Sequence, residues 1–420
     1  MGKFAATLKS FVDKKLWLFM GSGLIVSVAY IDPGNWGTNI GGGASYNYDL
    51  LWVIWMASAM AMLFQYLSGK LGIAGYSLPE LIKLRLNNNS AVLLYWVFAE
   101  LSILATDLAE FLGIVVALNL LFGIPLLWGT YIAVADVLVL LFLTRKKFRI
   151  LEGAFVGFVG IVGLAFVFEV IISKPDMTSI LLHSVKPTLT KESAFIAVGI
   201  IGATVMPHAL FVHSWLIKNK IINSNGTFKD KFKALRFHKI DNIASLTIAG
   251  LINAAMLIMA AAAFYNVADV ATLAGAYKTL IPLFGTFAAL VFAIALLSAG
   301  ISSSVTGTLA GQAIMDGLTG FKINLFVRRL ITRFINVIPL TIAILLGAEP
   351  LKILIYSQVT LSFLIPLPLI PIIMFTSNKS LMKELTNKKS TTIMAIVAAA
   401  IILVFNAYLL YLFLVKGIEL

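Results

Sequence analysis

Long apolar runs recur along the whole chain, and they limit its possible fold more than any other feature. Most are about 17–25 residues long, the length that an α-helix needs to cross the hydrocarbon core of a bilayer. Only 12% of the residues are charged, against about 25% in typical soluble domains. The sequence therefore predicts an all-α polytopic membrane protein, and disfavours a soluble helical protein with an unusually apolar core.

The apolar runs are separated by charged or Pro/Gly-rich breaks and give eleven candidate spans. They lie near residues 16–42, 50–69, 91–120, 126–144, 150–173, 194–217, 242–265, 280–316, 331–347, 352–374 and 391–415. We expect them to form one transmembrane domain over residues 1–420. The basic N-terminal segment is not followed by a small-residue cleavage pattern, so we expect it to be retained rather than removed as a signal peptide.

The basic residues are distributed unequally between the two sides that these spans define. If the N-terminus is cytoplasmic, the cytoplasmic segments hold 26 of the 32 Lys and Arg residues and the outer segments hold 6. Positive residues accumulate on the cytoplasmic side of membrane proteins. We therefore predict a cytoplasmic N-terminus and an extracellular C-terminus. The net charge of +13 then belongs to the lipid interface, and a nucleic-acid partner is not expected.

A few charged residues stand out within the spans, namely Asp32, Glu100, Asp107 and Glu110. Each costs on the order of 2.5–3.5 kcal/mol at the bilayer centre on insertion scales, so a functional role is the first interpretation. The spacing of Glu100, Asp107 and Glu110 places them on one helical face. That stripe suits a proton or cation path. The alternative is a set of structural ion pairs with basic residues such as Arg333.

Two spans contain a proline break beside polar residues. "DPGN" at 32–35 interrupts the first span, and "MPH" at 206–208 interrupts the sixth. Proline removes a helical hydrogen bond, and exposed backbone at membrane depth is tolerated only inside protein or beside a water cavity. Matched breaks are typical of inverted-repeat transporters. We predict two five-helix repeats, about 16–173 and 194–374, and an extra helix at about 391–415.

The donor atoms at the two breaks indicate the kind of ligand. Asp32 offers a carboxylate, Asn35 an amide oxygen and Met206 a thioether, and unwinding would free the carbonyl groups of Ala29 and Ala203. Oxygen donors with one soft sulfur suit Mn²⁺ or Fe²⁺ better than Mg²⁺ or Ca²⁺, which prefer oxygen-only shells. The alternative for Met206 is ordinary core filling.

The chain has four histidines, and two of them lie after the second break. His208 is a candidate proton acceptor that titrates near physiological pH, although it could also be a ligand. His213 lies seven residues after Met206 and is a second candidate relay. His183 and His238 are expected to be structural or solvated.

Five motifs in this order resemble those of the Nramp family, the natural resistance-associated macrophage proteins, which include bacterial proton-coupled manganese transporters. Besides the two breaks, they are "TDLAEFLGIVVALNLLFGIPL" at 106–126, "SSSVTGTLAGQAIMDG" at 302–317 and "SQVTLSFLIPLPLIPI" at 357–372. The resemblance covers nearly the whole chain. It implies a LeuT-type fold, which agrees with the five-plus-five arrangement.

The resemblance also implies roles for individual residues. The metal ligands would be Asp32, Asn35, Met206 and the Ala203 carbonyl, with the Ala29 carbonyl in the inward-facing state and Gln358 in some states. The proton route would involve Asp32 and His208, then Asp107 and Glu110, with Glu100 further along. The arginine that pairs with these acids matches Arg333, although Arg328 and Arg329 remain open. A magnesium-transporting branch lacks the ligand methionine, so Met206 counts against it.

The functional expectation is proton-coupled import of divalent transition metal ions through the plasma membrane by alternating access. Mn²⁺ is the first candidate, with Fe²⁺, Co²⁺ and Cd²⁺ also accepted, while the Met206 thioether discriminates against Ca²⁺ and Mg²⁺. We expect no cofactor and no obligate protein partner. A LeuT-fold carrier of organic solutes and a passive channel remain alternatives. An intramembrane enzyme is disfavoured because the sequence holds neither HExxH nor a serine elbow.

Overall fold

The computed structural model describes residues 22–138, 148–223, 230–265 and 285–416, together with Gly275 and Ile281. Within these ranges every regular element is a helix, which confirms the predicted all-α class. Residues 16–21 of the first predicted span, residues 139–144 of the fourth, and residues 280 and 282–284 of the eighth lie outside the described residues.

The helices follow the order of the predicted spans. The first half of the chain contains α3 (Ser22–Ala29), α4 (Pro33–Tyr46), α5 (Leu51–Ala74), α6 (Leu78–Leu86), α7 (Asn89–Phe122), α8 (Leu126–Ala133), α10 (Phe148–Ser173) and α11 (Met177–Val185). The second half contains α12 (Ala194–Val205), α13 (Pro207–Ile222), α14 (Lys231–Phe264), α16 (Thr286–Thr319), α17 (Leu325–Leu345), α18 (Pro350–Leu364), α19 (Pro366–Ser377), α20 (Lys379–Met382), the 3-10 turn η1 (Lys383–Leu385) and α21 (Lys389–Leu414).

Eight helical segments of the described chain are long and apolar enough to cross a membrane. Two of these segments join two helices each, α12 with α13 and α18 with α19. The other three predicted spans correspond to the interrupted pair α3 and α4, to the short apolar stretch Leu126–Leu138, and to α17. The first two are short, and α17 contains three arginines, Arg328, Arg329 and Arg333.

The tenth predicted span is interrupted, whereas the sequence predicts one continuous helix there. α18 ends at Leu364 and α19 begins at Pro366. Ile365 keeps helical dihedral angles and its N–H still bonds to Leu361, so the chain bends rather than unwinds. Proline rings clash with the preceding turn, which accounts for the kink.

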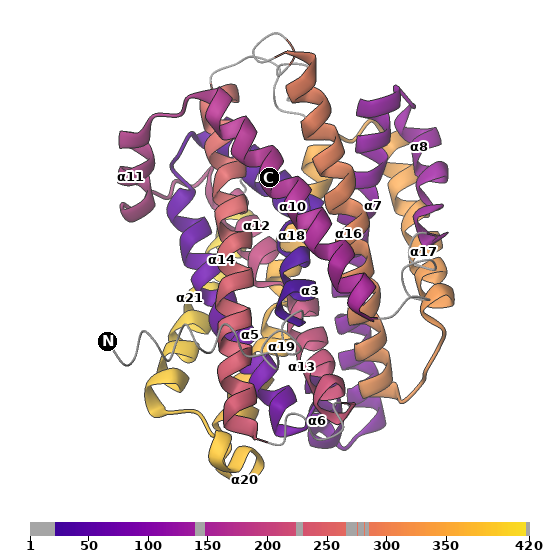
Figure 1. Cartoon of the computed structure of the whole chain (residues 1–420), viewed down its shortest axis with the longest axis vertical. Coiled ribbons are helices and arrows are strands. Elements are labelled where there is room, and N and C mark those ends of the chain that lie inside the picture. The colour runs from indigo at the N-terminus through magenta and orange to yellow at the C-terminus, as the bar shows by residue number, and fades with distance from the viewer. Residues whose placement is uncertain are drawn as a thin grey trace.

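The two interrupted helix pairs lie inside the bundle (Figure 1). α4 packs against α14, α12 packs against α18, and α16 lies along α7. The contact between α12 and α18 is close because Gly202 has no side chain: a Cβ there would overlap the backbone of Gln358. α4 also contacts both α12 and α18, so the first, sixth and tenth predicted spans lie together.

Candidate functional site

The first break begins where α3 ends and α4 starts. Pro33 is the first residue of α4, where its missing N–H costs nothing. Asp32 caps that helix, since its Oδ1 accepts the Asn35 N–H at 2.8 Å. The side chains of Asp32 and Asn35 are completely buried.

The second break is a single residue, Met206, between α12 and α13. Its φ of 38° lies in the left-handed region, which residues other than glycine seldom adopt. Pro207 then starts α13 in the same way that Pro33 starts α4. The second break is thus shorter than the first, and a strained backbone replaces the unwound stretch of Tyr30 to Asp32.

Both breaks free a backbone carbonyl group by the same means. In a helix each carbonyl accepts the N–H four residues later. The residues four positions after Ala29 and Ala203 are Pro33 and Pro207, which have no N–H. Both alanines are buried, so each break presents a carbonyl oxygen inside the protein without its helical donor.

Atoms from the two breaks meet at Asn35. One terminal atom of the Asn35 amide lies 2.7 Å from Asp32 Oδ1 and 3.1 Å from the Ala203 carbonyl oxygen. A nitrogen at this position donates to both oxygens, whereas an oxygen there would face two other oxygens. The second carboxylate oxygen of Asp32, Oδ2, is buried and has no hydrogen-bond partner. If the amide is turned so that its oxygen takes this position, the arrangement offers three oxygen donors to a cation.

Gln358 of α18 lies against the first break. A Cβ on Gly34 would overlap the Gln358 amide, so the two residues are in direct contact. The Nε2 of Gln358 donates to Ser357 Oγ at 2.9 Å, and its buried Oε1 has no partner. The backbone of Gln358 also contacts Gly202, one residue before Ala203.

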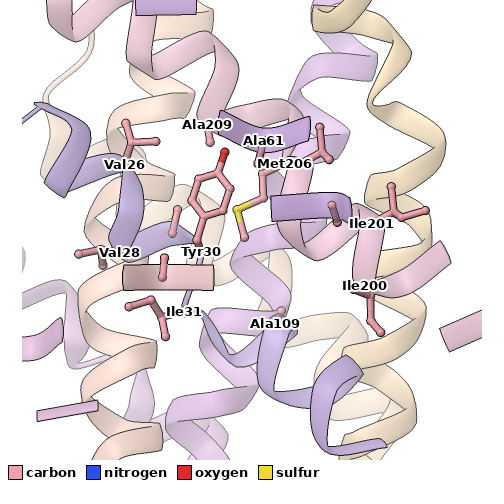
Figure 2. Close-up of a cluster of buried hydrophobic side chains, with 14 of the residues drawn as sticks. Val26, Val28, Tyr30, Ile31, Ala61, Ala109, Ile200, Ile201, Met206 and Ala209 are labelled. Carbon is pink, nitrogen blue, oxygen red and sulfur yellow. The ribbon is translucent and has the colours of Figure 1, made fainter. Parts of the chain in front are cut away.

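Met206 is fully buried in the same region. Figure 2 shows it in one cluster with Tyr30 and with apolar residues of the broken helices, including Ile201 and Ala209. The structure therefore brings together Asp32, Asn35, Ala203, Met206 and Gln358 around the breaks.

Asn253 of α14 was not singled out in the sequence, yet it supports the unwound backbone. Its Nδ2 donates to the Tyr30 carbonyl at 2.7 Å, and its Oδ1 accepts from Asn39 Nδ2 at 2.8 Å. Asn253 thus provides the hydrogen bond that the interrupted helix cannot. The available signal was a pair of amides within otherwise apolar spans.

His208 connects the second break to α7. Its Nδ1 lies 3.0 Å from Thr106 Oγ1, and the Thr106 hydroxyl donates to the Ser102 carbonyl at 3.0 Å. The Thr106 hydroxyl can donate to either partner, so the tautomer of His208 decides which atom donates in the His208–Thr106 hydrogen bond. Its Nε2 is left buried and without a partner.

His213 has different neighbours from His208. Its Nδ1 lies 2.7 Å from Gln65 Oε1, and Gln65 Nε2 donates to the Tyr30 hydroxyl at 2.8 Å. The His213 ring also meets the His238 ring, with centroids 5.0 Å apart. His238 is fully buried, so the solvated alternative for it is wrong, and the structural one stays a prediction. The sequence placed it in a loop, but α14 extends through it.

α7 carries the three predicted acids Glu100, Asp107 and Glu110. Each of them lies close to an arginine of α17. At one end of this stripe, Glu100 Oε2 and Arg328 Nη2 form an ion pair of 2.6 Å. Further along, Asp107 pairs with Arg329 and lies 3.2 Å from Arg333. All three arginines left open by the sequence therefore participate.

A fourth carboxylate, Asp136, completes the arginine contacts. It lies after α8 and pairs with Arg329 at 2.7 Å and with Arg333. Asn336 also donates to Asp107 Oδ2 at 2.7 Å. Asp136 was missed, although it is a single acid in the apolar run 126–144, which was sufficient to identify it.

Glu110 is the least satisfied acid of this group. Neither of its carboxylate oxygens has a hydrogen-bond partner, and Arg329 Nη1 lies 3.8 Å away. The carboxylate faces Gly307 of α16, where a Cβ would approach it to 3.1 Å. Glu169 of α10 is a second buried acid with two unpartnered oxygens, and the sequence reading also passed over it.

A family profile described as "Natural resistance-associated macrophage protein-like" matches residues 23–412. A relative named "Divalent metal cation transporter MntH" from Deinococcus radiodurans is 45% identical over 401 residues, which are 95% of this chain and 90% of the relative. A protein of the same name from Caldanaerobacter subterraneus is 43% identical over 407 residues, 96% and 95% of the two chains.

Solved structures give the same result for the fold. The Eremococcus coleocola manganese transporter matches with a TM-score of 0.85 and 30% identity, over 97% of this chain and 89% of its own. Mhp1, a nucleobase-cation-symport-1 family transporter, matches with a TM-score of 0.56 and 13% identity, over 93% and 88%. The second likeness concerns the fold alone and confirms the predicted LeuT-type architecture. By its profile match and its relatives, the chain belongs to the natural resistance-associated macrophage protein (Nramp) family.

Proposed function

We propose that the chain imports divalent transition metal ions through the plasma membrane together with protons, with Mn²⁺ as the first substrate. The relatives named as divalent metal cation and manganese transporters support this substrate class. Their family is one of membrane transporters, so the prediction that the chain is not an enzyme is confirmed.

The observation that carries the proposal is the meeting of oxygen donors from both breaks. In an octahedral shell with metal–oxygen bonds of about 2.1 Å, neighbouring oxygens are about 3 Å apart. The Asn35 amide atom lies 2.7 Å from Asp32 Oδ1 and 3.1 Å from the Ala203 carbonyl oxygen. These two distances are compatible with one ion bound between the donors once the amide oxygen is turned inward, which supports the proposal.

Met206 gives this donor set its selectivity. A thioether binds the softer Mn²⁺, Fe²⁺, Co²⁺ and Cd²⁺ better than Ca²⁺ or Mg²⁺, which favour oxygen-only shells. The Ala29 carbonyl and Gln358 stand beside the same break and serve as ligands in other states of the alternating-access cycle. Each ligand set then has one carboxylate, which limits the charge that remains when the ion leaves.

The acid–arginine cluster supports proton coupling by its charge count. Asp107, Glu110 and Asp136 face two guanidinium groups, Arg329 and Arg333. A fully ionised cluster would hold one uncompensated negative charge in the membrane, which is costly. One proton removes that charge, and Glu110, which makes no hydrogen bond, is the acid best placed to hold it.

His208 lies between the metal ligands and this cluster. It follows Pro207 of the second break, and its Thr106 partner is adjacent to Asp107. His208 Nε2 has no hydrogen-bond partner, which supports a role for His208 as a proton acceptor, and Glu100 with Arg328 extends the route along α7. A role for His213 in the same route remains a prediction, because its contacts are with Gln65 and His238.

Transport into proteoliposomes, with the internal pH recorded, tests both halves of the proposal. We expect Mn²⁺ uptake by the wild type to acidify the lumen, and we expect Asp32→Ala to reduce uptake to that of protein-free vesicles. Asp32→Ala removes the only carboxylate of the donor set while leaving the α7 cluster intact. Uptake near the wild-type rate in Asp32→Ala would exclude Asp32 as a ligand, and uptake without acidification would indicate a passive channel.

A further inference from the structure

A cavity of about 350 Å³ opens where α5 ends, beside α14 and the linker between α19 and α21. Figure 1 shows α20 of this linker at one end of the bundle, the end that also holds α6. The lining residues come from three separate parts of the chain: Ala74, Tyr76, Lys231 and residues 381–385. No predicted role in transport uses them.

The cavity lies at the depth of lipid headgroups. Ala74 is five residues beyond the predicted end of its span at residue 69, about 8 Å along a helix at 1.5 Å per residue. The polar layer of a bilayer occupies roughly 5–8 Å outside each side of the hydrocarbon core. The cavity is also at the end of the bundle that carries most of the basic residues.

Two lysines and an apolar floor line the cavity. Lys231 is held in place, since its Nζ donates to the carbonyl of Ala74, the last residue of α5, at 3.3 Å. Lys383 has a φ of 51° and is exposed on the linker. Of the other lining residues, Met382 and Leu385 are buried, with 2% and 3% exposure, so they belong to the inner part of the cavity. The cavity is thus basic on its rim and apolar at its base.

We propose that this cavity binds the anionic headgroup of a glycerophospholipid. The phosphate oxygens can accept hydrogen bonds from Lys231 and Lys383, and the apolar floor fits the glycerol backbone and the first methylene groups. Glu384, the one acid of the lining, repels a free phosphate dianion but can accept a hydrogen bond from a headgroup hydroxyl. The chemistry therefore fits a glycerol headgroup, such as that of phosphatidylglycerol, better than inorganic phosphate.

A specific site and a diffuse attraction to a charged surface make different predictions. Diffuse attraction depends on the number of lysines at this end of the bundle, whereas a site depends on which lysines are present. Lys239 and Lys322 offer a matched control, because both are exposed and neither lines the cavity. Lys383→Asn is the preferred neutral variant at its position, since asparagine tolerates a positive φ.

Native mass spectrometry of the purified full-length chain, titrated with phosphatidylglycerol, tests the proposal. We expect Lys231→Gln/Lys383→Asn to weaken the tightest lipid binding roughly 30-fold, equivalent to about 1 kcal/mol for each lysine. The control Lys239→Gln/Lys322→Gln should keep wild-type binding, and Lys231→Arg/Lys383→Arg should restore it. Phosphatidylcholine and inorganic phosphate are the comparison ligands, and a thermal-unfolding curve verifies that each variant folds.

Equal losses in the cavity variant and the control variant would overturn the proposal in favour of diffuse attraction. Inorganic phosphate that displaces the lipid at millimolar concentration would overturn the assignment to a lipid headgroup. Binding of phosphatidylcholine as tightly as phosphatidylglycerol would exclude an anionic site.

Discussion

The two buried polar regions of this protein satisfy their charges in opposite ways. Around the breaks, one carboxylate oxygen of Asp32 has no hydrogen-bond partner. The Asn35 amide forms hydrogen bonds there only when its nitrogen faces Asp32 and Ala203, because an oxygen in that position would face two other oxygens. In the cluster between α7 and α17, by contrast, Asp107 and Asp136 are held by Arg329 and Arg333. Among the described residues no basic side chain pairs with Asp32, whereas the α7–α17 cluster contains two guanidinium groups.

Under the proposed function, this difference separates a site for a transported ion from a fixed charge network. A site that releases its ion must tolerate unsatisfied oxygens for part of the cycle, so it uses neutral carbonyl and amide donors with a single carboxylate. A permanent cluster can keep more charge because its guanidinium groups never leave. Glu110 is intermediate, since it belongs to the cluster but makes no hydrogen bond.

Removing an arginine from the cluster should have the largest effect. Arg329→Leu leaves Asp107 and Asp136 without a principal partner, and losing one member of a buried pair costs about 3–5 kcal/mol. We expect the free energy of unfolding to fall by that amount in denaturant titrations. Arg236→Leu, at an exposed position of α14, is the control and should change it by less than about 0.5 kcal/mol. Equal stability of the two variants would show that the cluster is not a cooperative unit.

Removing the sulfur from the break site should alter discrimination without abolishing uptake. For Met206→Ala we expect Mn²⁺ transport to continue while Ca²⁺ and Mg²⁺ compete about tenfold better, equivalent to about 1.4 kcal/mol. Met206→Leu keeps the buried volume and should give the same result, which separates the donor atom from packing. Competition assays in proteoliposomes measure the effect. Unchanged discrimination in both variants would contradict a ligand role for the thioether.

Removing a surface ion pair should have the smallest effect on the free energy of unfolding. It serves as a reference for the buried ion pairs. Lys218 Nζ lies 2.5 Å from Glu80 Oε2, outside the predicted spans. Burial alone raises the pKa of Glu80, but hydrogen bonds from Lys218 and Ser77 outweigh it and hold that pKa below its ordinary value. The ionised Glu80 carboxylate therefore stabilises the folded state at any pH above its unfolded pKa. This stabilisation is lost as the pH falls through its folded pKa.

Lys218→Gln should consequently cost at most about 1 kcal/mol near neutral pH. The wild-type and variant unfolding curves should converge only once the pH falls below the lowered folded-state pKa of Glu80, because the carboxyl is then protonated in both the folded and the unfolded state. A difference that persists at low pH would mean that Lys218 acts through packing instead.

Much of the fold followed from the sequence because bilayers impose a length and prolines impose breaks. The positions of Pro33 and Pro207 identified both interrupted helices. The kink at Pro366 was missed because its break carries no polar residue, and helix interiors tolerate proline as a bend. The polar N-terminal extension of α14 was missed because hydropathy detects only the apolar part of a helix.

The sequence identified the charged residues of the cluster more readily than it identified which spans pair with each other. The stripe of acids on α7 was visible from its spacing, but spacing within one helix does not identify its partner helix. Arg328, Arg329 and Arg333 lie too close in sequence to rank without knowing how α17 is rotated. Asn253 supports the Tyr30 carbonyl from a distant helix, a contact that no local pattern records.

Gln358 has a consequence for the timing of transport. Its side chain rests on Gly34 of one break and its backbone rests on Gly202 beside the other, with no side chain between them. Under the proposed function, we therefore expect a rotation of α18 to displace both halves of the donor set together. The ion would then be released in a single concerted event instead of by stepwise loss of ligands, at a rate determined by how readily one helix turns.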